Sequence, residues 1–287
     1  MSWISTKYED DYWSRKNKIL PSFDNYKDNM NELCLHVDNI SFQLGDNKIL
    51  ENVSLISKMG TIHSIVGPNG AGKTSLLNCI NGFYRINKGN ILFDGNNISD
   101  FKPTTIAGLG ISRSFQRLSL FKGLTVLENI MVGRHKFITS GLVAGMIYRG
   151  KCLKEEYENQ SICEEILDFF EIEHLRSKRV GELTYGLQKR VEFAKALSLQ
   201  PRMLILDEPV AGMNLEEKGD VARFILDIRE ELGISIIMIE HELDMVMQLS
   251  DIVTVLNYGK VVGCGVPKDI VSSKEVLSAY LGESTAH

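Results

Sequence analysis

Short apolar runs alternate with amphipathic stretches along most of the chain. The first two runs, Leu33–Leu44 and Ile49–Ser57, alternate apolar and polar residues and are separated by the polar turn "GDNK", which predicts an antiparallel pair. Four later runs are nearly continuous in apolar residues, as is typical of parallel strands buried on both faces. These runs are Thr61–Val66, Arg202–Asp207, Ile234–Glu240 and Asp251–Leu256.

Helical periodicity fills the sequence between these runs. The stretch Glu216–Leu232 repeats its apolar residues with the spacing of a helix that covers a sheet. A longer segment, from about residue 118 to 182, is mostly helical in pattern and lies between the first and second of the parallel runs. The pattern therefore predicts an α/β fold, with a parallel-sheet core, an antiparallel β subdomain and an inserted α-helical subdomain.

Composition narrows the class of protein. With 44% hydrophobic and 24% charged residues the chain is of ordinary globular type, and its net charge of −5 argues against a protein that coats nucleic acid. The five cysteines are scattered and never form a CxxC pair, which favours reduced thiols over disulfides or a zinc site. Residues 1–31 are polar and contain both tryptophans, which predicts either a disordered or loosely docked extension or an arm whose aromatic residues anchor on a partner.

No run reaches the roughly 18 apolar residues that a membrane span needs, and the charged N-terminus does not resemble a signal peptide. If the protein works at a membrane, we expect it to do so from outside the bilayer.

The strongest chemical signal is "GPNGAGKTS", residues 67–75, between an apolar run and a potential helix. It fits the pattern G-x-x-x-x-G-K-[ST], in which glycines let backbone N–H groups surround phosphate oxygens at a helix N-terminus. The lysine supplies a charge to the outer phosphates, and the following hydroxyl is a ligand for Mg²⁺. The predicted nucleotide-binding residues are Gly67, Pro68, Asn69, Gly70, Ala71, Gly72, Lys73, Thr74 and Ser75.

Acidic and polar residues at other strand ends complete a candidate catalytic set. "MLILDEP" ends an apolar run, and predicts Asp207 as a Mg²⁺ ligand and Glu208 as the general base that activates water. His241 follows another apolar run, where it would reach a terminal phosphate at the same edge of the sheet. Gln116, in "SRSFQRLSLF", stands where the core gives way to the helical segment.

Together these motifs resemble the ATP-binding subunit of an ABC transporter, over about residues 33–283. The P-loop, the glutamine loop at Gln116, the signature "LTYGLQKR", "LILDEP", the D-loop "AGMN" and the switch histidine His241 occur in family order. "SRSFQRLSLFKGLTVLENIMVGRH", "TSGLVAGMIYRG" and "AYLGE" most resemble the larger ATP-binding subunit of branched-chain amino-acid importers. The resemblance implies a P-loop NTPase (RecA-like) core, with an ATP-binding domain over residues 32–284.

The resemblance also assigns roles. It implies binding of ATP and Mg²⁺, with Glu208, His241 and Gln116 catalytic and Thr74, Gln116 and Asp207 around the metal. In the family, the signature of one subunit closes over ATP that another subunit holds. Thr184 is a suitable N-cap and Gly186 falls in the first turn after it, so both would act on a phosphate supplied by the partner.

Two departures from the family pattern concern the nucleotide. Leu187 replaces the glutamine at the fifth position of the signature, and Leu44 stands where an aromatic residue often stacks on the adenine. Phe42, two residues earlier and on the same strand face, is the expected replacement.

The implied function is ATP hydrolysis that energises import of branched-chain amino acids or a related small solute. The implied partners are a second ATP-binding subunit (a paralogue or a copy of this chain), integral-membrane permease subunits and a periplasmic solute-binding protein, at the cytoplasmic face of the inner membrane. The alternatives are a lipopolysaccharide-type exporter ATPase and a soluble ABC ATPase acting on ribosomes or DNA. The single cassette, the lack of a long heptad run and the acidic balance disfavour the second, so no nucleic acid is expected.

Overall fold

The computed structural model describes residues 33–114, 119–137 and 151–272. Several features of the sequence analysis lie outside these ranges. They are the extension 1–31, Gln116, "TSGLVAGMIYRG" and "AYLGE".

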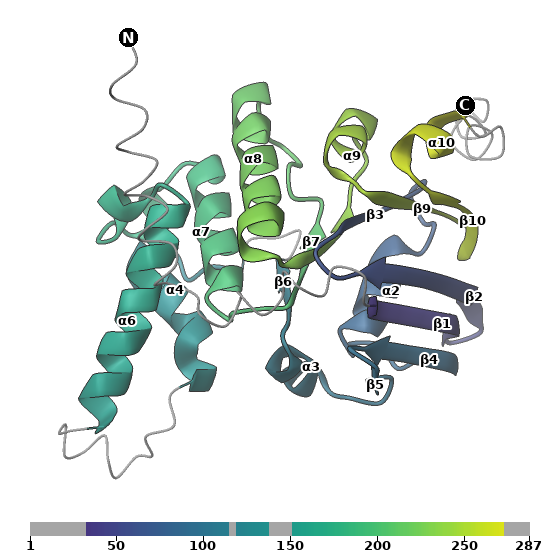
Figure 1. Ribbon diagram of the computed structural model, residues 1–287, viewed down its shortest axis with the longest axis horizontal. Helices are drawn as coiled ribbons and strands as arrows, with labels where there is room; N and C mark the ends of the chain where they lie inside the picture. Colours follow the sequence, from purple (N-terminus) through teal and green to yellow (C-terminus); the bar gives the residue numbers. More distant parts are fainter. Residues whose placement is uncertain (1–32, 115–118, 138–150, 273–287) are drawn as a thin grey trace.

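A six-stranded sheet forms the centre of the molecule, with the strand order β10-β9-β3-β8-β7-β6 (Figure 1). All neighbours are parallel except β10, which pairs antiparallel with β9. Every residue of β3, β7 and β8 is buried, which explains why their sequences are nearly continuous in apolar residues, and the predicted parallel strands are confirmed. The strands are β3 (Ile62–Val66), β6 (Ile111–Ser114), β7 (Met203–Asp207), β8 (Ser235–Ile239), β9 (Ile252–Asn257) and β10 (Lys260–Gly265).

A second, antiparallel sheet has the order β2-β1-β4-β5. The predicted pair is confirmed as β1 (Leu33–Leu44) and β2 (Asn47–Lys58), joined by a tight turn. β4 (Lys88–Phe93) and β5 (Asn96–Asn97) were not predicted, because their sequences are short and mostly polar and their residues mostly exposed. The inner face of this sheet packs with the P-loop helix α2 in one apolar cluster.

Helices cover the central sheet. α8 (Leu215–Leu232) confirms the predicted amphipathic helix, and it begins with a capping box in which Asn214 and Glu217 bond each other's backbone N–H groups. Its apolar side is buried, as the periodicity predicts. The other helices outside the helical group described next are α2 (Lys73–Ile80), α3 (Pro103–Leu109), α9 (Leu243–Leu249) and α10 (Pro267–Ser272).

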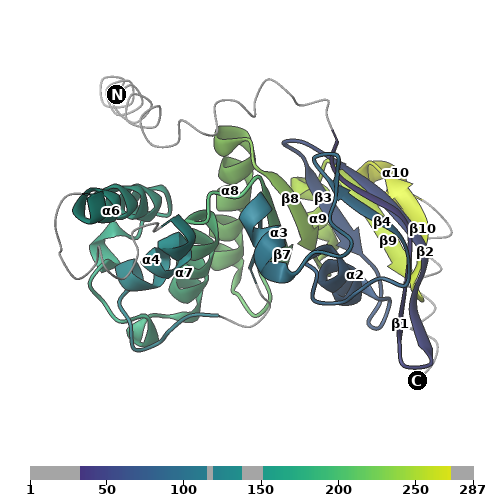
Figure 2. The ribbon, with the colours of Figure 1, turned by 90° about the horizontal axis from the view of Figure 1, so that it is seen from below.

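A group of helices lies at the end of the molecule opposite the antiparallel sheet (Figures 1 and 2). α7 packs on α4 and α6, so helical packing continues past residue 182, where the sequence placed the end of the helical subdomain. The domain boundaries themselves stay a prediction. The group consists of α4 (Val126–Arg134), η2 (His135–Phe137), α6 (Lys151–Phe169), η3 (Glu173–Leu175), η4 (Val180–Glu182) and α7 (Tyr185–Leu197).

None of the described helices combines the length and the apolar character needed to cross a bilayer.

Candidate nucleotide-binding site

In the glycine loop between β3 and α2, the backbone adopts conformations that are rare for residues with a side chain. Gly67 has φ 147°, and a Cβ there would overlap the carbonyl oxygen of Leu256 on the neighbouring strand β9. Gly72 is the N-cap of α2 in the left-handed region, and it has no side chain to cap the first turn. The loop is therefore a concave stretch of backbone that ends in a helix N-terminus without a side-chain cap, an arrangement that suits an anion.

Lys73 lies across this loop. Its Nζ donates to the carbonyl oxygens of Gly67 (2.6 Å) and Pro68 (2.8 Å), and the residue is 6% exposed. The ammonium is thus held at the mouth of the loop by the loop's own carbonyls. Thr74, on the next position of α2, is exposed, so its hydroxyl is accessible to a ligand.

Asp207 ends β7 and is bound by an arginine that the sequence analysis missed. Arg113 on β6 donates through Nη2 to Asp207 Oδ2 (2.6 Å) and through Nη1 to Asn78 Oδ1 (2.7 Å) on α2. The side chains of Arg113 and Asp207 are almost completely buried. Arg113 therefore ties the strand before Gln116 both to the acidic strand end and to the P-loop helix. No local pattern marks it, because its partners are 35 and 94 residues away.

Glu208 and His241 meet where the adjacent strands β7 and β8 end. The register pairs Asp207 with Ile239, and the backbone N–H of Glu208 donates to the Ile239 carbonyl (3.0 Å). Their side chains then lie at hydrogen-bond distance, with His241 Nε2 2.6 Å from Glu208 Oε1. Glu208 has φ 50°, an unfavourable conformation for a residue with a side chain, and such strain is often found at functional sites.

The residues fit ATP and Mg²⁺. The loop passes so close to β9 that a Cβ at Gly67 would overlap the Leu256 carbonyl, and Lys73 places a cation at the mouth of the loop. The Thr74 hydroxyl and the Asp207 carboxylate are oxygen donors, the type that Mg²⁺ prefers. Oδ1 of Asp207 accepts no hydrogen bond from a described residue, whereas Oδ2 accepts from Arg113.

The prediction for Phe42 does not agree with its surroundings. Phe42 is 5% exposed and its ring stacks on Tyr84 at 4.8 Å between centroids, whereas Leu44 is 59% exposed. The two residues share a strand face, but Leu44 lies at the end of β1, beyond the apolar cluster that contains Phe42. Phe42 would have to leave this cluster to stack on an adenine, so we do not retain it as a nucleotide contact.

The signature residues are on α7, with β7 between them and the P-loop helix α2 (Figures 1 and 2). The Thr184 side chain caps α7 by accepting from the Leu187 N–H (3.5 Å), as predicted, and Gly186 is in the first turn. Gly186 is buried against Glu217 of α8, whose Oε1 would lie 2.5 Å from a Cβ at this position.

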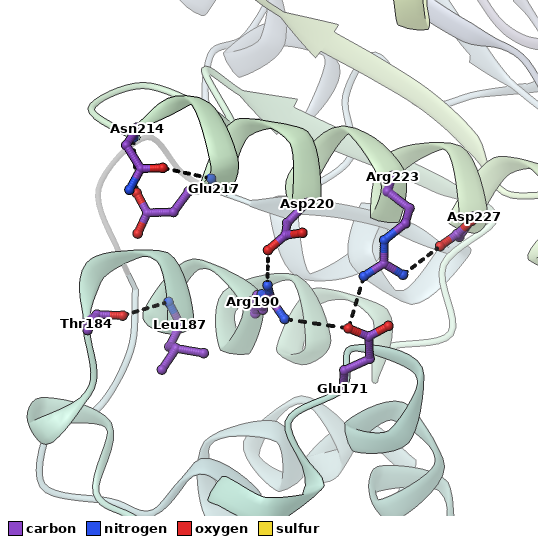
Figure 3. A network of polar contacts seen from close by, with 9 residues as sticks. All are labelled: Glu171, Thr184, Leu187, Arg190, Asn214, Glu217, Asp220, Arg223 and Asp227. Carbon is purple, nitrogen blue, oxygen red and sulfur yellow. Dashed lines mark hydrogen bonds and ion pairs between the residues drawn. The ribbon is translucent and has the colours of Figure 1, made fainter.

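Charged side chains join α7 to α8 next to the signature (Figure 3). Arg190 pairs with Asp220 of α8 and lies 3.9 Å from Glu171, which also accepts from Arg223 (3.0 Å). The position of the signature turn is therefore set by α8, the helix that begins at the D-loop. The P-loop and the signature are not brought together within this chain.

A parallel α/β sheet with a glycine loop, a lysine at its mouth and acidic residues at the end of another strand of the same sheet defines a P-loop nucleotide-binding protein. The family model described as "ABC transporter" matches residues 50–211. The chain belongs to this family and is an ATP-binding subunit of an ABC transporter.

Curated relatives match nearly the whole chain. The high-affinity branched-chain amino acid transport ATP-binding protein BraF of Pseudomonas aeruginosa is 34% identical over 255 residues, 89% of this chain and 100% of the relative. LivG of Escherichia coli, of the same description, is 33% identical with the same coverage. A probable LivG of Methanocaldococcus jannaschii is 33% identical over 87% of this chain and 97% of the relative.

Solved structures share the fold. The ATP-binding cassette MJ1267 in its ADP conformation has a TM-score of 0.77 and 31% identity, covering 88% of this chain and 100% of that one. A nucleotide-free ATP-binding cassette from an ABC transporter has a TM-score of 0.75 and 31% identity, covering 87% and 99%.

Proposed function

We propose that the chain hydrolyses ATP, and that hydrolysis energises the import of branched-chain amino acids or a related small solute. The hydrogen bond of 2.6 Å between Glu208 and His241 carries the first part, because it joins a general base to an orienting histidine beside the P-loop. The second part is supported by the relatives BraF and LivG, which are named as branched-chain amino acid transport proteins and match the chain over most of its length.

In this proposal the N-terminus of α2 and Lys73 bind the outer phosphates of ATP. Thr74, Asp207 and Gln116 hold Mg²⁺, which supplies positive charge to the phosphate oxygens. Glu208 accepts a proton from the attacking water, and His241 fixes the orientation of the Glu208 carboxylate through Nε2.

The signature acts on a second nucleotide. Thr184 and Gly186 are at the start of a helix of 13 residues, and β7 lies between this helix and the P-loop helix α2 (Figure 1). In this proposal a second ATP-binding subunit, a paralogue or a copy, therefore supplies the phosphate. The further partners are permease subunits and a periplasmic solute-binding protein, with the chain on the cytoplasmic face of the inner membrane. Co-purification of a permease from detergent-solubilised membranes tests this assembly; recovery of ribosomes or DNA without a permease would contradict it.

The variant Glu208→Gln tests hydrolysis. We expect ATP turnover to fall at least about 100-fold, the usual contribution of a general base, while ATP binding is retained. Glu216→Gln is the matched control, because it removes one exposed carboxylate from the first turn of α8. Turnover of Glu208→Gln equal to that of the control would exclude the role of Glu208.

A further inference from the structure

Glu240 is a buried acid between β8 and His241. The residue is 3% exposed, and no described lysine, arginine or histidine forms an ion pair with it. Burial raises the pKa of its carboxyl, and hydrogen bonds from backbone N–H groups oppose this effect. A buried carboxylate without a cation is costly, so its two oxygens need other donors.

Those donors come from two different loops. Oε1 accepts from the N–H of Val210 (3.3 Å), in the loop that follows Glu208. Oε2 accepts from the N–H of His241 (3.1 Å), in the loop that follows β8. The side chain of Glu240 therefore connects the backbone next to the general base with the backbone of the histidine.

Two further hydrogen bonds join the same two strand ends, so that the Glu240 contacts and the two catalytic side chains form a ring of hydrogen bonds. The strand ends are joined by the hydrogen bond from the Glu208 N–H to the Ile239 carbonyl, and the side chains by the bond between His241 and Glu208. Glu240 therefore adds a connection between the two loops beyond the strand ends, next to the side-chain bond itself. Glu208 and His241 are 20% and 38% exposed, so water competes for that bond.

We infer that Glu240 is a positioning residue for ATP hydrolysis, which holds the two loops so that Glu208 and His241 stay at hydrogen-bond distance. A carboxylate suits this role because both its oxygens accept, one from each loop. A glutamine has a single acceptor oxygen and would turn an N–H donor toward the second loop. The effect on turnover rests on the proposed hydrolysis, whereas the effect on the side-chain bond does not.

Nitrogen NMR of the histidine rings in the isolated full chain measures the bond directly. His241→Gln identifies the His241 signals by their loss, and Glu208→Ala gives their position when the bond is absent. In Glu240→Ala we expect the His241 Nε2 signal to move to the position seen in Glu208→Ala, and in Glu240→Gln to move part of the way. Unchanged His241 signals in both Glu240 variants would overturn the inference.

The matched control is Glu242→Gln. Glu242 is two residues away and its side chain pairs with Lys218 (2.5 Å). Its backbone N–H also acts on the Glu240 carboxyl, so the variant removes a charge from the same loop while leaving the backbone donors of Glu240 in place. We expect wild-type His241 signals in this control. If Glu242→Gln shifts them as far as Glu240→Ala does, net charge rather than positioning is the cause. Glu240→Gln, which preserves volume, decides the question if Glu240→Ala does not fold.

Turnover supplies the second measurement. We expect Glu240→Ala to lower kcat at least 10-fold with KM for ATP changed less than twofold, because the P-loop is untouched. A general loss of structure would change both. Should Glu208→Gln leave turnover unaltered, the proposed hydrolytic role fails, and the NMR signals still decide whether Glu240 positions His241.

Discussion

The two helix starts that the family uses for phosphates, α2 and α7, are built in opposite ways. α2 begins at Gly72, which has a left-handed backbone and no side chain to cap the helix. α7 begins at Thr184, which has an extended backbone and caps the helix with its hydroxyl. Around α2 the chain supplies Lys73 and a buried Arg113–Asp207 pair, whereas next to α7 it places the carboxylate of Glu217.

This difference indicates that the start of α2 belongs to a site that this chain builds itself, whereas the start of α7 contributes to a site that a partner completes. At α2 the chain supplies positive charge and hard oxygen donors next to an open helix N-terminus, which is everything a nucleotide phosphate requires. At α7 the first turn is already capped by Thr184, and Arg190, the cation next to the signature, is paired with Asp220 of α8. Changes near α2 should therefore affect the isolated chain, and changes near α7 should affect it little.

The largest expected difference in the free energy of unfolding is between variants of two arginines. Arg113→Met leaves the buried Asp207 without its cation, and we expect the free energy of unfolding to fall by about 3–5 kcal/mol. Arg190→Met removes a partly exposed pair with Asp220, for which we expect a loss of about 1 kcal/mol. Urea unfolding measures both; equal losses would contradict the contrast between the two sites.

Variants of two glycines should show the next largest difference, in stability and in nucleotide binding. Gly67→Ala forces a Cβ into the Leu256 carbonyl at an unfavourable φ, so we expect loss of nucleotide binding and about 2–4 kcal/mol of stability. Gly186→Ala displaces the Glu217 side chain and so disturbs its bond with the Asn214 N–H, but alanine is the better helix former, so the net change should be within about 1 kcal/mol. Fluorescent-nucleotide titration of the isolated chain should find binding unchanged in Gly186→Ala; lost binding would place the signature in the chain's own site.

The last expected effect is a gradual loss of stability in acid. His63, on the strand that leads into the P-loop, is buried and bonded to Thr254 (2.8 Å), and burial lowers its pKa to about 4. The unfolded chain takes up this proton near pH 6.5, so the contribution is complete above that pH and is lost as the pH falls toward 4. We expect a loss of about 1 kcal/mol per pH unit in this range.

His63→Gln should remove this slope from urea unfolding measured between pH 6.5 and 5. His135→Gln, at an exposed position on the helical side of the molecule, is the control and should retain it. An unchanged slope in His63→Gln would show that another group titrates.

Local signals in the sequence located the P-loop, the strand ends that carry Asp207, Glu208 and His241, and the cap of α7. Each depends on neighbours within a few residues, such as the continuous apolar run before Asp207 or the spacing of Gly67 and Lys73. Arg113 and Glu240 escaped notice because an arginine in a strand and a glutamate before a histidine are ordinary locally. The burial of Phe42 was not foreseen, because strand alternation predicts a face but not the point at which the core ends.

The sequence by itself determined the parallel sheet, its glycine loop and the order of the catalytic residues, since these follow from hydrophobic periodicity and from backbone conformations that only glycine adopts freely. Only the tertiary structure decided which charges meet. Four contacts join residues about 30 or more positions apart in the sequence. They are Arg113 with Asp207, Glu208 with His241, Glu240 with Val210, and Gly186 with Glu217. Such contacts depend on how strands and helices align in space. A hydrogen bond requires a donor and an acceptor about 3 Å apart, and the number of residues between two positions in the sequence does not predict that distance.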